Sequence, residues 1–498
     1  MIKTDTVVKI HESDNVLVAL SEVKAGDTVL GVTASENIPA GHKMATVDIQ
    51  PNENIIKYGN PIGHATKAIT AGQHVHTQNI KTNLSGLLEY SYNPVAAAKI
   101  DRLADSTFMG YQRKDGQVGI RNEIWIVNTV GCVNKIAEKI AAQAMADKDI
   151  SGRVDGVYTF VHPYGCSQLG DDHTHTQHVL ADMVRHPNAA AVLVLGLGCE
   201  NNLISEFKKV LGEWDDERVK FLNTQDCADE VADGLQVIRE LSEYAGTFKR
   251  EPVPVGKLII GLKCGGSDGL SGITANPLVG SLSDAVIAHG GTAILTEVPE
   301  MFGAETLLMN RSVDSSVFDK TVCLINDFKE YFMRHKQEIY ENPSPGNKEG
   351  GISTLEEKSL GCTQKGGESQ VVDVLNYGER VKIPGLNLLQ GPGNDIVAVT
   401  NLMAAGAHMV LFTTGRGTPL GGPVPTVKIS SNSALAKGKP HWIDFDAGVL
   451  VDAAAGKDMQ SLTADFLAYL IRVAEGEETQ NEKNGYREIS IFKDGVTL

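Results

Sequence analysis

The chain has 498 residues, of which 42% are hydrophobic and 21% are charged, a composition that excludes a disordered or collagen-like protein. Its formal net charge of −17 argues against a surface that binds nucleic acid or an anionic membrane. The sequence starts without a signal-peptide pattern, and its longest apolar run, residues 189–198, is too short to cross a bilayer, so we expect a soluble, cytoplasmic protein of about three domains.

One short pattern occurs three times near the start, at residues 23–30, 38–45 and 69–76. Each copy has an apolar residue, a turn that contains glycine, and then the alternation that is typical of a strand. Ordinary hairpins give the same pattern, but three copies so close together favour a small all-β module over residues 1–92. His42 lies in the second copy, where a lone histidine is usually structural. Residues 93–107, rich in Tyr, Asn, Pro and Ala, are predicted to form a linker.

Strands and helices alternate in the rest of the chain, which is typical of an α/β fold with parallel strands. We expect a middle domain over residues 108–250 and a C-terminal domain over residues 255–498. The predicted strands are residues 124–130, 157–161, 190–195, 258–262, 292–296, 385–389 and 409–412. The predicted helices are residues 133–146, 175–185, 203–211, 305–309, 318–336 and 395–405. Ligands of such open sheets bind at the carboxyl ends of the strands.

Cysteines follow four of the predicted strands, each in a turn rich in glycine. They are Cys132, Cys166, Cys199 and Cys264. His162, Glu200 and Asp268 are close to them in sequence, and Glu297 follows another predicted strand. One such cysteine is more often a small buried hydrophobic residue, but four in equivalent positions favour metal or redox chemistry. The spacings match neither a zinc ribbon nor a bacterial ferredoxin, and seven cysteines in all argue against a disulfide framework.

Two further segments are suited to anions. Residues 413–419 follow a predicted strand and offer hydroxyl groups, turn amides and Arg416, whose guanidinium can grip a carboxylate with two hydrogen bonds. Lys348 lies in a Pro- and Gly-rich loop over residues 342–351, which is equally consistent with a plain surface loop. The three histidines of residues 171–178 fit a solvated helix start as well as a metal site. A dinucleotide motif is incomplete, because Asn201 replaces its third glycine.

Long motifs in all parts of the chain closely resemble the altronate/galactarate dehydratase family. They include IKYGNPIG, YGCSQLGDDH, LGLGCENN, CGGSDGLSGITANP, EVPEMFGAE, YENPSPGNK, FTTGRGTP and HWIDFDAG. The resemblance implies an N-terminal β-clip (SAF-like) module, an α/β middle domain used in dimerisation, and a C-terminal Rossmann-like variant with a mostly parallel sheet. It also implies ferrous iron and the elimination of water from a sugar acid.

Such an elimination removes a weakly acidic proton beside a carboxylate, which requires a divalent metal and a proton-transfer pair near neutral pH. We expect His162, and less strongly His42, to transfer the protons. The expected metal ligands are Cys199, Cys264, Asp268, Glu297 and Glu300, a mixed set acceptable to Fe(II), with Mn(II) as the alternative. The expected substrate-binding residues are Arg416, Thr414, Lys348 and Ser267.

The motif versions HPYGCSQLGDDH and EVPEMFGAE favour the altronate branch of the family. The expected reaction therefore converts D-altronate into 2-keto-3-deoxy-D-gluconate in a homodimer, with no nucleic-acid or membrane partner. Three alternatives stay open at this point: a galactarate-type dehydratase, an iron–sulfur hydro-lyase with a cluster on Cys132, Cys166 and Cys199, and a sugar-acid-binding regulator without chemistry. The lack of a helix-turn-helix pattern or a basic stretch counts against the regulator.

Overall fold

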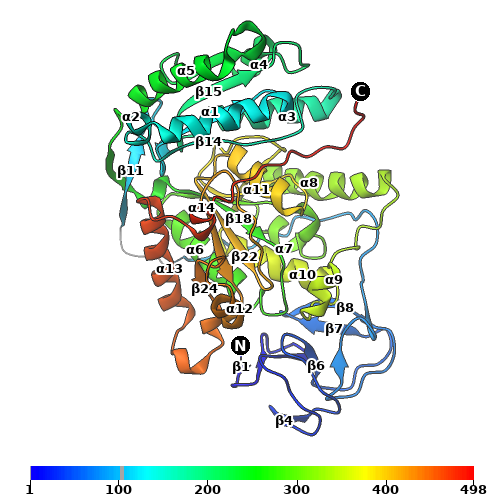
Figure 1. Cartoon of the computed structure of the whole chain (residues 1–498). Coiled ribbons are helices and arrows are strands. Elements are labelled where there is room, and N and C mark those ends of the chain that lie inside the picture. Colours follow the sequence, from blue (N-terminus) through cyan, green and yellow to red (C-terminus); the bar gives the residue numbers. More distant parts are fainter. Residues whose placement is uncertain (1, 101–105) are drawn as a thin grey trace.

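The structure, a computed structural model, describes residues 2–100 and 106–498; Met1 and residues 101–105, the latter within the expected linker, lie outside the described residues. Three parts follow one another in space (Figure 1). The N-terminal module (residues 2–83) lies at one end, the C-terminal unit (residues 255–498) in the centre, and the middle unit (residues 106–254) at the other end.

The N-terminal module consists of short antiparallel strands. β1, β2, β3, β6 and β9 form a five-stranded sheet in that order, β10, β8 and β7 form a second sheet, and β4 pairs with β5. β3 and β6 are buried along their whole length, and Val16, Ile62 and Val75 are among the residues fully buried in the module. The strands are β1 (Ile2–Lys3), β2 (Val7–Lys9), β3 (Val16–Ala19), β4 (Thr28–Val29), β5 (Val32–Thr33), β6 (Lys43–Ala45), β7 (Asn54–Lys57), β8 (Asn60–Ala65), β9 (His74–Val75) and β10 (Ile80–Lys81).

An extended segment, residues 84–100, leaves the module and runs along the C-terminal unit. The hydroxyl of Tyr90 donates a hydrogen bond to Glu305 Oε1 at 2.6 Å, and that of Tyr92 donates to Ser312 O at 2.7 Å. Val95 N also donates to Asn310 O at 2.9 Å, so the segment is tied to the C-terminal unit by individual hydrogen bonds rather than through a sheet.

The middle unit contains a four-stranded parallel sheet with the order β14-β13-β15-β16. β15 is buried along its whole length, which explains its almost continuous apolar sequence. A small antiparallel sheet, β12-β11-β17, adjoins the four-stranded sheet. The elements are β11 (Thr107–Gln112), β12 (Val118–Gly119), β13 (Glu123–Asn128), α1 (Asn134–Ala146), α2 (Lys148–Ser151), β14 (Gly156–Thr159), α3 (Gly170–Arg185), β15 (Ala189–Gly196), α4 (Ile204–Leu211), β16 (Val219–Asn223), α5 (Glu230–Ala245) and β17 (Arg250–Pro254).

The C-terminal unit is built on a parallel sheet of seven described strands, in the order β20-β21-β19-β18-β22-β23-β24. The central strands are fully buried between helices on both faces. The elements are β18 (Ile259–Cys264), α6 (Ala275–Ala288), β19 (Thr292–Leu295), α7 (Glu305–Met309), α8 (Ser315–Arg334), α9 (Pro345–Glu349), α10 (Leu355–Cys362), β20 (Val371–Leu375), β21 (Gly385–Leu389), α11 (Asp395–Ala404), β22 (Met409–Thr414), β23 (Thr426–Ser430), α12 (Ser433–Gly438), β24 (Phe445–Asp446), α13 (Met459–Ala474) and α14 (Gln480–Lys483).

Buried contacts join the middle and C-terminal units. One hydrophobic cluster includes α3 of the middle unit together with α11 and β22. Two buried ion pairs cross the same boundary, Arg121 with Glu482 at 2.8 Å and Arg487 with Glu123 at 2.9 Å. The end of the chain then runs back over the middle unit, where Leu498 N donates to Ser167 O at 2.9 Å.

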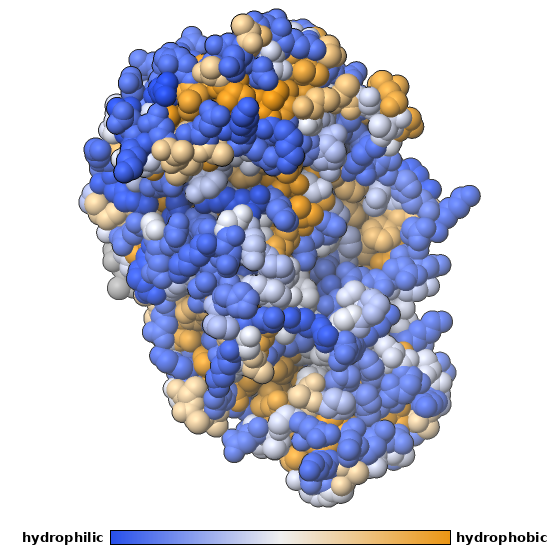
Figure 2. Space-filling view, viewed as in Figure 1, coloured by the Kyte–Doolittle hydropathy of each residue, from blue (hydrophilic) through white to orange (hydrophobic). Residues whose placement is uncertain are grey.

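The expected fold class is confirmed: an all-β module precedes two α/β units whose main sheets are parallel. Among residues 2–100 and 106–498, no helix is long and apolar enough to cross a membrane. Hydrophilic residues cover most of the face shown in Figure 2, in keeping with the net charge of −17.

Candidate active site

The C-terminal sheet changes its winding direction beside β18. β19 lies on one side of β18 and β22 on the other. The loops that leave the carboxyl ends of β18 and β22 therefore diverge. Open α/β sheets bind ligands in a crevice of this kind. The two loops also touch, because the backbone N–H groups of Gly415 and Arg416 donate to Gly266 O at 3.0 and 2.9 Å. Gly266 has a φ of +64°, a backbone conformation that favours glycine.

Buried acids and lysines lie directly behind these loops. Glu297 follows β19, and its carboxylate contacts the ammonium groups of Lys263, the next-to-last residue of β18, and Lys365, the latter at 3.2 Å. Burial raises the pKa of Glu297 to about 7, although both lysines oppose the shift. Glu297 has a φ of +72°, which is uncommon for a non-glycine residue and is seen mostly where function demands it.

A second acid, Glu300, belongs to the same layer. Its Oε1 lies 2.8 Å from Lys358 Nζ, and its Oε2 accepts a hydrogen bond from Cys362 Sγ at 3.1 Å. Burial acts to raise the pKa of Glu300, but the charges of Lys358, Lys263 and Lys365 outweigh it and lower the pKa to about 2. Glu300 is therefore a carboxylate at neutral pH.

Cys264, the last residue of β18, is a buried thiol with an unusual environment. Interaction with the side chain of Cys362, aided by the charge of Lys365, lowers the pKa of Cys264 to about 5 against the effect of burial. Its Sγ lies 2.6 Å from Ser267 Oγ. At neutral pH Cys264 is thus a thiolate next to a hydroxyl group that can carry a proton to or from it.

Asp268 and Arg416 form the outer rim of the crevice. The Asp268 carboxylate accepts hydrogen bonds from Ser271 and Ser431 at 2.9 and 2.8 Å and from Asn432 at 3.0 Å, so it ties the loops after β18 and β23 together. The Arg416 guanidinium is 43% exposed and lies 2.9 Å from a carboxylate oxygen of Glu349 at the end of α9. Arg416 therefore already holds one carboxylate, in a position open to solvent.

The N-terminal module docks on this rim. Gly41 packs against Gly269 and Gly350, where a Cβ at Gly41 would lie 2.9 Å from Gly350 O. Beside that contact, Glu357 of α10 is held between two lysines of the module, Lys43 and Lys57, each at 2.8 Å, and all three side chains are buried. Burial lowers the pKa of Lys43 to about 8, whereas the two ammonium groups hold the pKa of Glu357 far below its usual range despite burial.

A small cavity remains between the module and the C-terminal unit. Lys57 and Tyr58 line it from the module, and Ser267, Asp268 and Cys362 are among the residues that line it from the other side. Its free volume of about 10 Å³ holds about one water molecule. A six-carbon acid therefore either binds at the open rim or enters when the module moves.

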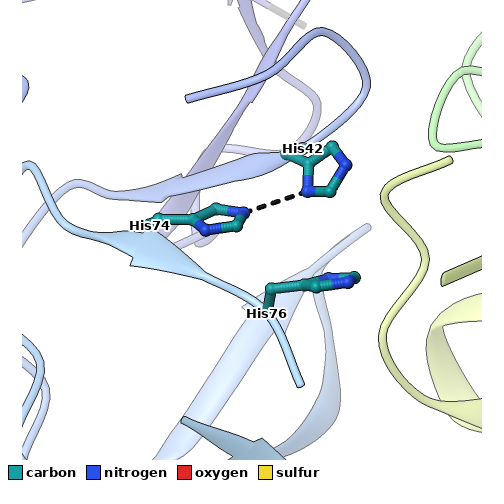
Figure 3. A group of neighbouring side chains, drawn as sticks. All are labelled: His42, His74 and His76. Atoms are coloured by element: carbon teal, nitrogen blue, oxygen red, sulfur yellow. Dashed lines mark hydrogen bonds between the residues drawn. The ribbon is translucent and has the colours of Figure 1, made fainter. Parts of the chain in front are cut away.

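Three histidines of the module converge next to the docking contact (Figure 3). His42 Nδ1 and His74 Nε2 lie 2.9 Å apart, and the ring of His76 lies 4.8 Å from that of His42. His42 Nε2 also donates to Glu349 O of the C-terminal unit at 3.1 Å. Burial lowers the pKa of His42, and it lowers those of His74 and His76 to about 4 and about 3, so all three rings are neutral at pH 7.

The structure brings together most of the expected site residues. His42, Arg416 and Asp268 lie at the rim, and Cys264, Glu297 and Glu300 form the layer behind it. Ser267 links the two groups through Cys264, and Thr414 accepts a hydrogen bond from Gly417 N within the Arg416 loop. Lys348 belongs to α9, one residue before Glu349, and is partly buried.

His162 and Cys199 belong to the middle unit and are not part of this group. His162 is buried, its Nε2 donates to Asn128 O at 2.9 Å, and its Nδ1 accepts from Tyr164 N at 3.2 Å. With both ring nitrogens bonded to backbone, His162 has a structural explanation. Cys199 is exposed and contacts Gln225. The rule that strand ends converge applies within each sheet, and these two residues follow strands of the other sheet.

The five expected metal ligands do not form a compact ligand group. Glu297 and Glu300 are neutralised by lysines, the Asp268 carboxylate is occupied by hydrogen bonds, and Cys199 lies in another unit. Among the residues that the structure describes, one group of three or more His, Cys, Asp or Glu side chains has all its ligand atoms within 4.8 Å, and it consists of His42, His74 and His76. Cys132, Cys166 and Cys199, exposed at strand ends of the middle unit, are not in it.

Several site residues were not expected from the sequence. They are Lys263, Lys358, Lys365, Glu357, Glu349, His74 and His76. Of these, His74 and His76 had a visible signal, because two histidines separated by one residue in a strand point to the same side. The buried lysines had none, since a lysine in sequence is read as a surface residue.

Family models match three segments of the chain. They are described as "Altronate/galactarate dehydratase SAF domain" for residues 5–83, "D-galactarate dehydratase/Altronate hydrolase, second domain" for residues 110–246, and "D-galactarate/Altronate dehydratase, C-terminal" for residues 255–497. The chain belongs to the altronate/galactarate dehydratase family. The expected resemblance is thereby confirmed, and the N-terminal module is a SAF domain.

Relatives from this family match over nearly the full length. The chain is 55% identical to Altronate dehydratase of Escherichia coli (strain K12) and 52% identical to that of Bacillus subtilis (strain 168), in each case over 495 residues and 99% of both chains. It is 31% identical to Galactarate dehydratase (L-threo-forming) of E. coli over 509 residues, which is 97% of this chain and 96% of the relative. The chain is accordingly an enzyme of the hydro-lyase class.

Proposed function

We propose that this enzyme dehydrates D-altronate to 2-keto-3-deoxy-D-gluconate at the rim between the SAF module and the C-terminal unit. The observation that carries the choice of substrate is the full-length identity of 55 and 52% to two altronate dehydratases, against 31% to a galactarate dehydratase. The rim agrees with this choice, since it presents one exposed guanidinium, that of Arg416, to a substrate with one carboxylate.

Arg416 binds the substrate carboxylate in the proposed reaction. Its partner Glu349 is 72% exposed, so the existing ion pair is weak and a substrate carboxylate can replace it. A guanidinium that donates two parallel hydrogen bonds also fixes the orientation of C2 and C3 relative to the loop after β18. Removal of the C2 proton adds negative charge next to this carboxylate, and the positive charge of the Arg416 guanidinium stabilises it.

Two groups near the rim are suited to move protons at neutral pH. The Cys264 thiolate reaches the cavity through the hydroxyl of Ser267, which lines it. His42 is neutral and hydrogen-bonded to the C-terminal unit. One of these two bases accepts the C2 proton and then, in its protonated form, delivers that proton to the departing C3 hydroxyl, so that water leaves. The enol that forms then tautomerises to the 2-keto acid.

Fe(II), with Mn(II) as a substitute, is the proposed cofactor. When bound, such an ion would draw charge from the substrate carboxylate and 2-hydroxyl and so acidify C2. The expected ligands in the C-terminal unit are poorly suited to hold it, because Glu297 and Glu300 are paired with buried lysines.

The proposal is tested with purified enzyme and a 2-keto-acid assay. D-Altronate should be converted several-fold more efficiently than galactarate, because galactarate brings a second carboxylate for which the rim offers no second exposed guanidinium among the described residues. Exhaustive chelation should abolish turnover, and Fe(II) with a thiol reductant should restore it. Equal kcat/KM for galactarate would refute the substrate assignment, and full activity after chelation would refute the metal requirement. A colourless active Fe(II) enzyme would in addition exclude an iron–sulfur cluster on Cys132, Cys166 and Cys199.

A further inference from the structure

The convergence of His42, His74 and His76 follows from the strand pairing of the module. β6 and β9 are antiparallel, with Lys43 opposite Val75 and Met44 opposite His74. One position further along, His42 stands opposite His76. His74 and His76 point to the same face because they are two residues apart in an extended segment. Figure 3 shows the result, with the three rings directed at one another from two neighbouring segments.

Packing alone does not account for this group. The centroids of the three rings lie 4.8 to 5.6 Å apart, and neutral imidazoles form no ion pair with one another. The hydrogen bond within the group joins His42 to His74. His76 Nδ1 is buried and has no hydrogen-bond partner among the described residues. A buried polar atom of this kind is destabilising unless something binds it. The group is therefore incomplete as a purely structural cluster.

We propose that His42, His74 and His76 form a site for one divalent transition-metal ion, bound through three imidazole nitrogens with its remaining positions open. Three histidines with open positions are the usual arrangement of catalytic rather than structural metal sites. Imidazole suits iron, cobalt, nickel, copper and zinc, whereas magnesium and calcium prefer oxygen. The proposal deepens the proposed function by giving its metal a place. It leaves the proton transfer to Cys264, since a metal-bound His42 with its Nε2–H bonded to Glu349 O has no free ring nitrogen. Metal binding itself does not depend on the choice of substrate.

The observed spacing requires only small shifts on binding. Metal–nitrogen bonds of about 2.1 Å place two ligands roughly 3.0 to 3.4 Å apart, depending on the coordination angle. The ligand atoms of the three histidines now lie within 4.8 Å of one another, with the closest pair at 2.9 Å. The rings can reach the bound arrangement through side-chain rotations, without a change in the strand pairing.

Neighbouring groups orient the rings as ligands. A carbonyl only accepts, so His42 Nε2–H donates to Glu349 O, which leaves the Nδ1 lone pair of His42 directed into the group. Gln78 Nε2 lies 3.4 Å from His74 Nδ1 and holds that ring with its Nε2 facing His42. For His74 Nε2 to bind a metal, the proton on Nε2 must be replaced by one on Nδ1. The side-chain amide of Gln78 then flips, so that its oxygen accepts a hydrogen bond from His74 Nδ1–H.

The charges around the group permit a cation. The ammonium group of Lys43 acts on the rings of His74 and His76, but it is offset by Glu357 at 2.8 Å. On the other side, Glu36 accepts a hydrogen bond from His74 N at 3.1 Å. Glu349 connects the site to the substrate rim, because its carbonyl contacts His42 while its carboxylate contacts Arg416. The proposed metal site and Arg416 are thus linked through one residue.

The experiment uses the full-length enzyme, stripped of metal and titrated with Co(II), whose visible absorption reports the ligand field. Wild type should bind one Co(II) per chain with strong visible bands. His74→Ala and His76→Ala should lose these bands and bind Co(II) at least about tenfold more weakly. His11→Ala is the matched control, since His11 is an exposed histidine of the same module, bonded to Ser13. Co(II) binding by both triad variants equal to that of wild type would overturn the proposal.

Two further measurements separate the outcomes. X-ray absorption of wild type with Co(II) needs no variant, so it decides the matter even if the substitutions impair folding: three imidazole ligands support the site, and sulfur ligands overturn it. His42→Gln distinguishes a ligand from a proton carrier, because a ligand role predicts weaker Co(II) binding, whereas unchanged Co(II) binding with lost turnover removes His42 from the site. Enzyme that binds Co(II) at the triad but does not dehydrate D-altronate would refute the proposed function alone.

Discussion

Replacement of Glu357 by glutamine should loosen the docking of the SAF module. Glu357 forms ion pairs of 2.8 Å with Lys43 and Lys57, and all three side chains are at most 1% exposed. Loss of one partner from a buried ion pair costs about 3 to 5 kcal/mol, because the remaining charge stays buried. Lys43 can limit the loss by releasing its proton, since its pKa is already lowered to about 8, and we therefore expect about 3 kcal/mol.

Hydrogen exchange is the suitable assay, because a chain of several units does not unfold in two states. About 3 kcal/mol corresponds to a loss of protection of roughly 100-fold in β6 and β9, with little change in the sheet of the middle unit. Glu138→Gln is the control, since Glu138 forms a surface ion pair with Lys135 and its loss should matter little. Replacement of Glu357, Lys43 and Lys57 together by methionine should restore most of the protection. Protection within threefold of wild type in Glu357→Gln would refute the reasoning.

Three further predictions concern charge. Arg416→Lys should raise KM for D-altronate about tenfold or more, because a lysine cannot donate the paired hydrogen bonds, and unchanged kinetics would remove Arg416 from the site. The free energy of unfolding should fall as the pH drops from about 4.5 toward 2, because the pKa values of Glu300 and Glu357 are lower in the folded than in the unfolded chain. Between pH 7 and about 4.5 Glu297 should make the free energy of unfolding rise as the pH drops, because folding raises its pKa to about 7. Unfolding measured between pH 2 and 7 checks both trends. A free energy of unfolding that does not decrease as the pH drops from 4 to 2 would contradict the trend predicted for Glu300 and Glu357. Thiolate absorbance should titrate near pH 5 in wild type and lose that step in Cys264→Ser, and an identical titration of the variant would contradict the assignment.

Alternation of apolar strands and helices was enough to predict the fold class and many elements. β13, β15, β18, β22, α1 and α11 lie within a few residues of their predicted positions. α10 was not predicted, because its sequence LEEKSLGC has no apolar face, yet the whole helix is buried. Its charged residues Glu356, Glu357 and Lys358 have partners far away in the chain, at residues 82, 43 and 300. A sequence pattern contains no information about such distant partners.

The candidate site was predictable where it depends on one sheet and not where it depends on two units. Cys264, Asp268 and Arg416 were found because they follow neighbouring strands of the same parallel sheet. His162 and Cys199 satisfy the same rule within the other sheet, and no pattern shows that the two carboxyl edges do not share a crevice. His42 was selected for its chemistry, but its partners His74 and His76 become neighbours only through the pairing of β6 with β9.

The crevice between β18 and β22 also has a bearing on the order of events during synthesis. β18 ends at residue 264, but its neighbour β22 begins only at residue 409, after β19, β20 and β21 have been made. A nascent chain that ends before residue 409 therefore exposes one edge of β18, its buried Lys263 and the apolar faces that β22 later covers. Pairing between strands so far apart in sequence is slow, and exposed edges of this kind invite association with other chains. Truncated or slowly translated forms of this enzyme should depend on chaperones more than the compactness of the finished fold suggests.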